Sequence, residues 1–197
     1  GGASAASEVY KGKPKNMYGF EVPQNYAQAI KLDTRNGNTK WQDSTVLEMY
    51  QLDGYDVFSN LGKDGNPGTG YKKIRVHLIY AVKYDGRHKA RLVADGHLTD
   101  VPVNSLYSGV VSLRGLRMLI LLAELNGLET LATDIGNAYL EALTSELVFI
   151  IAGPEFGERE GHVLVIHRAL YGMRSSGLRW HEKYSAVMGG IGFQPCK

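Results

Sequence analysis

Cysteine is almost absent from this sequence. Cys196 is the only thiol among 197 residues, and a single thiol cannot form an internal disulfide. Nothing in the fold therefore depends on an oxidising environment. A reducing, intracellular compartment is the expected location.

Long apolar runs are also missing. The longest strongly apolar stretch, residues 118–123, is far shorter than the roughly 20 residues that a membrane-spanning helix needs. The first residues, "GGASAASEVYKGKPK", have no apolar centre that could act as a secretory signal. We therefore expect no membrane span, and a flexible N-terminal lead-in over residues 1–21.

The chain has no large excess of charge of either sign, but its charge is unevenly distributed. The net charge of +2 is too small to imply nucleic-acid binding by itself. Residues 72–97 are nevertheless distinctly basic, and two interpretations remain open: a solvated basic hairpin, or a surface that grips phosphates. The basic residues of this segment are Lys72, Lys73, Arg75, Lys83, Arg87, Lys89 and Arg91, against the acidic Asp85 and Asp95.

Hydrophobic periodicity predicts a mixture of helices and strands. Helical spacing indicates a short helix within "VPQNYAQAIKLD", closed by "TRNGN", and a second helix over about residues 41–52. The stretch "GKDGNPGTG", 62–70, is expected to be a loop. Alternating residues on either side of Asp85-Gly86 predict a β-hairpin within residues 72–97.

The second half of the chain continues this mixture. Residues 107–126 have the spacing of a core helix, and "ETLATDIGNAYLEA" is interpreted as a strand that leads into a turn. The stretches "ELVFIIAG" and "HVLVIHRAL" predict two more strands, and "SSGLRWHEKYSAVMGGIGF" predicts a final helix. The fold class expected is α+β, with an antiparallel sheet and packed helices.

Asp134, in "LATDIGNAYL", is a candidate functional residue. A carboxylate at the end of an apolar strand, just before a turn, can be presented to a hard cation such as Mg²⁺. The alternative is that Asp134 caps the turn at Gly136-Asn137. One carboxylate is not a metal site, so its spacing leaves both interpretations open. The histidines lack metal-ligand spacing, and none is assigned to zinc.

Three motifs in a fixed order resemble one protein family. They are "KARLVADGH" at 89–97, "ATDIGNAYLEA" at 132–142 and "ALYGMRSSGLRWHE" at 169–182. In this order they resemble the reverse transcriptase of copia-type retrotransposons, whose usual patterns are "KARLVAKG", "DVKNAFLHG" and "LYGLKQAPRAW". The resemblance covers about residues 22–197 and implies reverse-transcriptase-like fingers and part of the palm.

The resemblance implies a role for each matched residue. Asp134 matches the first catalytic aspartate, which holds two Mg²⁺ ions together with a later Asp-Asp pair, and Ile135 would add its backbone carbonyl as a metal ligand. Tyr139 matches the aromatic residue under the sugar of the incoming nucleotide, which favours deoxynucleotides. Lys89 and Arg91 match the cations that meet the triphosphate. Gly136 belongs to the same nucleotide-binding set.

The third motif implies contacts with the template. Its template-side residues are Tyr171, Gly172, Arg174 and Ser175. The chain departs from the family pattern here, because Ser175-Ser176-Gly177 stands where Gln-Ala-Pro is common. Small residues still permit close approach of the backbone. Core packing is the alternative role for Tyr171, and also for Trp180 and His181, which follow in the same motif.

One family motif does not occur. Copia-type enzymes carry a Tyr-x-Asp-Asp hairpin downstream of the third motif, and residues 1–197 contain no Asp-Asp pair. We therefore expect this chain alone to be inactive as an RNA-directed DNA polymerase, with Mg²⁺, primer–template and deoxynucleotide used only by the complete enzyme. The alternative is a non-catalytic structural or interaction subunit, or a nucleic-acid-binding remnant, with a protein partner covering an open edge of the palm sheet.

Overall fold

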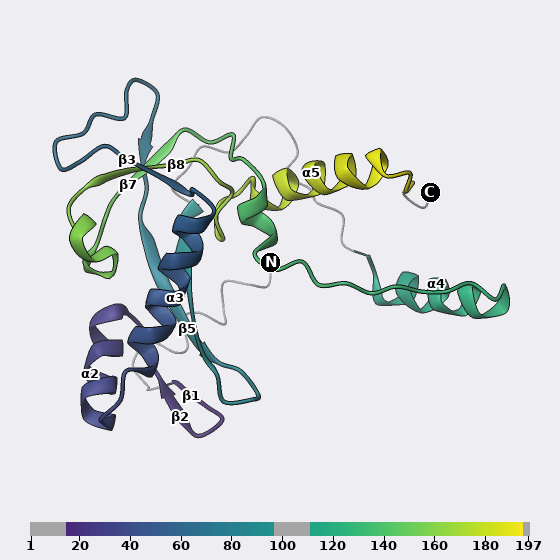
Figure 1. The fold of residues 1–197 in the computed structure, drawn as a ribbon, viewed down its shortest axis with the longest axis horizontal. Coiled ribbons are helices and arrows are strands. Elements are labelled where there is room, and N and C mark those ends of the chain that lie inside the picture. The colour runs from purple at the N-terminus through teal and green to yellow at the C-terminus, as the bar shows by residue number, and fades with distance from the viewer. Residues whose placement is uncertain (1–14, 97–110, 195–197) are drawn as a thin grey trace.

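The computed structural model of the chain describes residues 15–96 and 111–194, which form a mixed α+β fold (Figure 1). The first half contains β1 (Lys15–Met17), β2 (Phe20–Val22), α2 (Tyr26–Asn36), α3 (Lys40–Gly54), β3 (Phe58–Asn60), β4 (Lys72–Lys73), β5 (Val76–Val82) and β6 (His88–Ala94). The second half contains α4 (Leu113–Leu125), the 3₁₀ helix η2 (Ala138–Glu141), β7 (Val148–Ile151), the 3₁₀ helix η3 (Pro154–Arg159), β8 (Val163–Ile166) and α5 (Ser176–Gly190).

The first described residues form a hairpin. We expected residues 15–21 to belong to the lead-in, but β1 and β2 pair in antiparallel fashion, with Met17 opposite Phe20. The hairpin leads directly into the core, where Val22 is buried. Residues 1–14 lie outside the described part. For these residues the flexible lead-in, expected over residues 1–21, remains a prediction.

Helices α2 and α3 confirm the two helices expected near the N-terminus. The Asn25 side chain caps α2 by accepting the Gln28 N–H at 2.9 Å. The helix runs through Thr34 and Asn36 and stops at Gly37, whose φ of 62° suits a residue without a side chain. The sequence therefore placed the end of α2 slightly too early, because Gly37 is the only breaker in "TRNGN" whose conformation ends the helix.

The predicted basic hairpin is confirmed as β5 and β6. The strands pair from Val76 opposite Ala94 to Val82 opposite His88, around a turn at Gly86, where φ is 82°. Helix α3 packs on the hairpin, and the hydroxyl groups of Thr45 and Tyr80 lie 2.9 Å apart in the buried contact. The buried face of the hairpin consists of Leu78, Tyr80, Val82, Ala90, Leu92 and Ala94.

A second sheet has the strand order β3-β8-β7-β4. Strands β7 and β8 confirm the two strands expected between residues 146 and 170, and they pair in antiparallel fashion, as do β3 and β8. Strand β4 runs parallel to β7. Strands β8 and β7 are the two inner strands of this sheet, and all four residues of β8 are buried. Helix α5 confirms the final predicted helix.

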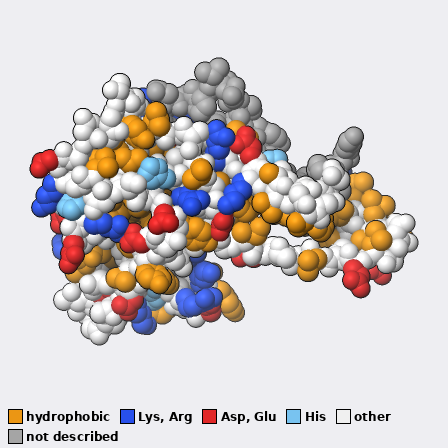
Figure 2. All heavy atoms as spheres, turned by 45° about the horizontal axis from the view of Figure 1, so that its top comes forward, with side chains coloured by type: hydrophobic (Ala, Val, Ile, Leu, Met, Phe, Trp, Pro, Cys, Tyr) orange, Lys and Arg blue, Asp and Glu red, His pale blue; other side chains and the backbone are white. Residues whose placement is uncertain are grey.

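A helix is present within the expected range 107–126, but the prediction that it belongs to the core is wrong. Helix α4 spans Leu113–Leu125, residues 107–110 lie outside the described part, and Ala123 is the only residue of the helix that is buried. Figure 1 shows α4 apart from the three sheets, and hydrophobic side chains lie at the surface of this projecting part in Figure 2. Apolar periodicity predicts a face that avoids water, but it does not say what covers that face.

The strand expected around Asp134 is also wrong. Within the described residues, positions 128–135 join no sheet and are exposed, and η2 follows them. A strand requires an edge to pair with, and no described strand lies beside this stretch. The fingers-and-palm arrangement therefore remains a proposal, while the α+β class is established. No helix in residues 15–96 and 111–194 is both long and apolar enough to cross a membrane.

Candidate functional site

A pocket of about 440 Å³ lies between α3, β6 and the stretch that contains Asp134. Six of the residues singled out by sequence lie on its wall. These six residues come from three separate motifs, which the fold brings together around one cavity. They are Lys89, Arg91, Asp134, Ile135, Gly136 and Tyr171.

The two predicted cations lie two residues apart on β6, so they point to the same side of the strand. The Arg91 guanidinium lies 4.0 Å from the centroid of the Tyr171 ring, a cation–π contact that fixes its orientation. Burial lowers the pKa of the Lys89 ammonium, and the nearby charges of Arg91 and Lys83 lower it further. Like charges that repel one another at a half-buried site are stabilised by an anionic ligand.

Glu48 is a pocket residue that the sequence interpretation missed. It lies on α3 and is buried, and its Oε1 accepts the Leu92 N–H at 2.9 Å. Burial raises the pKa of this carboxyl, while the Leu92 N–H and the charges of Arg91 and Lys89 oppose that rise. The only signal in the sequence was an acidic residue within the apolar stripe of a helix, a position that usually packs against the core.

Backbone groups at the outer edge of β6 also belong to the site. The Leu92 N–H donates to Glu48, and the Ala94 N–H donates to the Tyr171 carbonyl at 2.7 Å. Because N–H directions alternate along an antiparallel strand, the Ala90 N–H points to this same edge. Ala90 lines the pocket. The edge therefore offers a neutral backbone donor between the two cationic side chains.

Asp134 lies at the rim of the pocket and is exposed, as are Ile135 and Gly136. In the part of the chain that the structure describes, no N–H group donates to the Asp134 carboxylate. The turn-capping interpretation therefore lacks its hydrogen bond. Asn137, which follows, adopts a left-handed conformation with φ of 51°. This turn directs the chain into η2 and leaves Asp134 on the pocket wall.

Tyr139 lies beside the pocket rather than on its wall. Its ring centroid is 4.9 Å from that of Tyr171, and both side chains are half-buried. Burial raises the pKa of the Tyr171 hydroxyl, and the neighbouring Arg91 opposes this rise. The two rings form a connected aromatic wall that extends from the guanidinium of Arg91 to η2.

The remaining residues of the third motif form a turn that docks on the end of β6. Gly172 has a φ of 89°, and a Cβ atom there would clash with the Ala94 carbonyl oxygen. The Arg174 Nε donates to the Gly96 carbonyl at 3.0 Å. The Ser175 N–H and hydroxyl both donate to Glu146 Oε1. Gly172, Arg174 and Ser175 do not line the pocket, and their template-side role remains a prediction.

The donor set does not fit a two-metal site. Asp134 is one carboxylate at the rim, and the other carboxylate on the pocket wall, Glu48, already accepts a backbone N–H. Within residues 15–96 and 111–194, no group of three His, Cys, Asp or Glu side chains could hold a metal ion. A pair of Mg²⁺ ions requires more carboxylate oxygens than these residues supply.

Comparison with known proteins agrees with the motifs. The chain is 33% identical over 113 residues to the Ty1-BL and Ty1-DR4 transposon Gag-Pol polyproteins of Saccharomyces cerevisiae, a match that covers 56% of this chain. It spans only 6% and 7% of those polyproteins. No solved structure matches the chain. The reverse transcriptase (RNA-dependent DNA polymerase) family profile matches residues 64–197, well over half of the chain, and the chain therefore belongs to that family.

Proposed function

We propose that the chain provides the fingers and the first part of the palm of an RNA-directed DNA polymerase of a copia-type retrotransposon. One observation carries the proposal: Lys89, Arg91 and Asp134, from two distant motifs, line the same pocket. Lys83 and Arg87 line the pocket as well. Several cations together with a carboxylate suit a ligand that carries both a polyphosphate and a reacting centre. The proposal assigns the pocket to the incoming deoxynucleoside triphosphate.

Each wall of the pocket has a part in binding that ligand. Lys89 and Arg91 bind the phosphate oxygens, and the Tyr171 ring holds the Arg91 guanidinium in place for bidentate contact. Ile135 and Gly136 bring the backbone close to the nucleotide. Tyr139, beyond Tyr171, supports the sugar and crowds a 2′-hydroxyl group.

The nucleic-acid substrate is proposed to lie across the same surface. An RNA or DNA primer–template would contact the basic segment around β5 and β6, with the turn that contains Tyr171, Gly172, Arg174 and Ser175 on the template side. Docking of this turn on β6 links the template side to the strand that carries Lys89 and Arg91.

Magnesium belongs to the complete polymerase in this proposal. Asp134 would supply one of the carboxylates for it, and within residues 15–96 and 111–194 no group of three His, Cys, Asp or Glu side chains could complete the metal site. Residues 1–197 alone are accordingly expected to bind nucleotide and nucleic acid without catalysing nucleotidyl transfer.

Asp134→Asn tests the proposal in the native polypeptide that contains this chain. The change removes the negative charge at the pocket rim and keeps the size of the side chain. We expect primer extension on an RNA template to fall by about 100-fold or more, as for other losses of preorganised electrostatic groups. Lys63→Ala, on an exposed loop away from the pocket, is the control. Primer extension at the wild-type rate by Asp134→Asn contradicts the catalytic assignment.

A second candidate function is a non-catalytic structural or interaction subunit. The exposed apolar side chains of α4 favour it, because such a surface on a stable chain is normally covered by protein. The partner would cover this helix and the unpaired stretch 128–135, in place of the open sheet edge expected from sequence. The intact mass of the native polypeptide separates the two candidates: 21.7 kDa favours the subunit, and a larger mass with a downstream Tyr-x-Asp-Asp peptide favours the polymerase.

A further inference from the structure

The short helix η2 carries Tyr139, and its two ends differ in how the fold holds them. Before η2, the stretch 128–135 is exposed and joins no sheet within the described residues. At its other end, Leu140 and Ala142 are buried, and the Ala142 carbonyl accepts the Ala169 N–H at 2.9 Å. A 3₁₀ helix of four residues has too few internal hydrogen bonds to be stable by itself. The position of Tyr139 therefore depends on contacts at the C-terminal end of η2.

Glu141, the last residue of η2, is contacted by side chains from three other parts of the fold. Lys183, on α5, donates from Nζ to the Glu141 carbonyl, and the same Nζ lies 3.2 Å from the carboxylate Oε2. Arg168, which follows β8, donates from Nη1 to this carbonyl at 3.3 Å and from Nε to the Tyr55 carbonyl at 3.1 Å. Burial raises the pKa of the Tyr55 hydroxyl, and the nearby Glu141 carboxylate raises it further.

Lys183 makes the stronger of the two cationic contacts with the end of η2. The carbonyl of the last residue of a helix has no acceptor role within that helix, so it needs an outside donor. A charged donor forms a shorter and stronger hydrogen bond than a neutral one. The Arg168 contact is longer, and its guanidinium is shared with the Tyr55 carbonyl. Lys183 also contacts the Glu141 carboxylate, so it holds both the main chain and the side chain of this residue.

The contacts continue from Glu141 to the candidate nucleotide pocket. The Ala142 N–H donates to the Tyr139 carbonyl at 3.0 Å, which links the end of η2 to the residue that carries the ring. The Tyr139 ring centroid lies 4.9 Å from that of Tyr171, and Tyr171 contacts the Arg91 guanidinium. A displacement of η2 would therefore move a ring that borders the pocket. Small displacements of a positioned group are enough to change how a ligand is bound.

We propose that Lys183 is a positioning residue for sugar selection: through Glu141 it fixes the Tyr139 ring where that ring excludes a 2′-hydroxyl group. The inference rests on the proposed function, which places the sugar of a nucleotide beside Tyr139. The sequence motifs assign a role to neither Lys183 nor Glu141. Lys183 lines a different cavity from the nucleotide pocket, so its effect on the ligand passes through η2.

The affinities of the chain for dATP and for ATP provide the test, because the two ligands differ only in the 2′-hydroxyl group. Isothermal titration calorimetry gives their ratio for the wild type, Lys183→Met and Lys183→Arg. We expect the wild type to prefer dATP, and Lys183→Met to reduce this preference by about 3- to 10-fold. Lys183→Arg should keep most of the preference, since a guanidinium can donate to the same carbonyl. A general loss of stability would weaken both ligands alike and leave the ratio unchanged.

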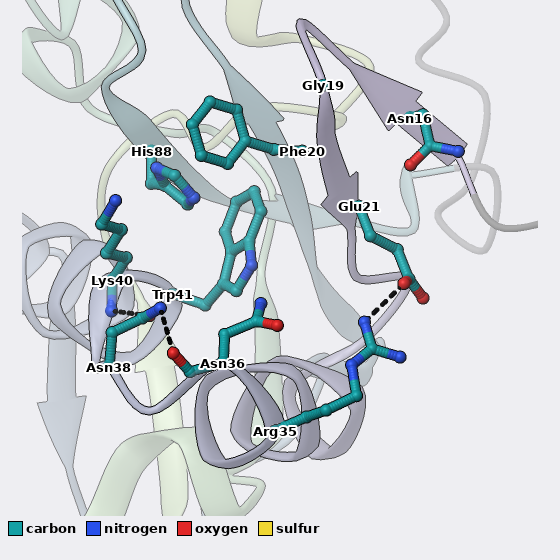
Figure 3. Close-up of a pocket in the computed structure, with 10 residues that line it drawn as sticks. All are labelled: Asn16, Gly19, Phe20, Glu21, Arg35, Asn36, Asn38, Lys40, Trp41 and His88. Carbon is teal, nitrogen blue, oxygen red and sulfur yellow. Dashed lines mark hydrogen bonds and ion pairs between the residues drawn. The ribbon is translucent and has the colours of Figure 1, made fainter.

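Arg35→Met is the matched control, because it also breaks an ion pair of an exposed cation. Arg35 lies 2.5 Å from the Glu21 carboxylate, and Figure 3 shows this pair joining α2 to the β1–β2 hairpin. The pair makes no contact with η2, so the variant should keep the wild-type ratio. The Lys183 side chain is 41% exposed, and Lys183→Met should therefore fold as Arg35→Met does.

A double variant tests the route through the ring. Tyr139→Ala should lose the preference for dATP, and adding Lys183→Met to it should change the ratio no further, because both changes act on the same contact. A further fall in the double variant would show that Lys183 acts by another route, and this result would overturn the inference.

The remaining outcomes separate the inference from the proposed function. If Lys183→Met keeps the wild-type preference, the inference is wrong and the proposed function survives. If the wild type binds dATP and ATP equally, the sugar role of Tyr139 and the inference are both wrong, while the triphosphate site survives. If the chain binds neither nucleotide, the inference and the nucleotide-binding part of the proposed function are both wrong.

Discussion

Glu48 connects helix α3 to the strand that carries the two pocket cations. Its carboxylate accepts the Leu92 N–H at the open edge of β6, and this edge would otherwise leave a backbone donor unpaired. The same carboxylate is buried, which raises its pKa above the ordinary value of 4.5. Glu48 therefore holds β6, and with it Lys89 and Arg91, against α3. The energetic cost is the burial of a carboxyl group.

Glu48→Gln should remove the pH dependence that this burial produces. Because the folded pKa is raised, the folded state binds more protons than the unfolded state between pH 4.5 and that raised pKa. The contribution of Glu48 to the free energy of unfolding therefore falls as the pH rises through this window. The Gln carbonyl can still accept the Leu92 N–H. Urea unfolding from pH 4 to 7 should therefore show the variant gaining stability relative to wild type as pH increases. Exposed Glu158→Gln is the control, and a relative loss with rising pH would contradict the assignment.

Individual site residues were only partly predictable from the sequence. The family resemblance pointed to Lys89, Arg91 and Asp134, and the structure places them around one pocket. Glu48 could not be recognised as a pocket residue, because the sequence does not show that a Glu on a helix accepts a hydrogen bond from a distant strand. The Ala90 N–H depends on strand pairing, which a side-chain pattern does not record.

At the level of helices and strands, sequence patterns predicted an element correctly where the element that it packs against lies close in sequence. The β5–β6 hairpin followed from alternation around Asp85-Gly86, and its two strands pair with each other. Helix α4 and the stretch 128–135 gave equally clear apolar patterns, yet both are exposed in the described structure. Their periodicity identified the apolar surface correctly but could not identify what covers it.

Leu119→Ala distinguishes the exposed α4 from the core helix that periodicity predicts. Leu119 is 51% exposed, so truncation should change the free energy of unfolding of this chain by less than about 0.5 kcal/mol. The matched change Leu92→Ala, at a fully buried position of β6, should cost about 2–5 kcal/mol. Urea unfolding of both variants gives the comparison. Similar losses at the two positions would show that α4 is covered, contrary to the structure.

At the scale of the whole molecule, the described residues combine a packed half and an open half. Helix α3 covers the β5–β6 hairpin, α2 packs against α3, and together they form a continuous core with the four-stranded sheet. Helix α4 and the chain before η2 are exposed. The chain spans 6% to 7% of the polyproteins it resembles. The packed half contains Lys89 and Arg91 of the proposed nucleotide pocket, so nucleotide binding is the property that this chain should show by itself.

The affinity of residues 1–197 for a deoxynucleoside triphosphate is the most direct test of the proposed nucleotide pocket. Isothermal titration calorimetry would compare wild type with Lys89→Ala/Arg91→Ala and with Lys63→Ala/Lys73→Ala, a pair of exposed cations outside the pocket. Loss of two charge-assisted contacts should weaken binding by about 10- to 100-fold in the first variant, and the second should bind within about twofold of wild type. Equal affinities in the first variant and the wild type, or equal losses in both variants, would contradict a specific triphosphate site at Lys89 and Arg91.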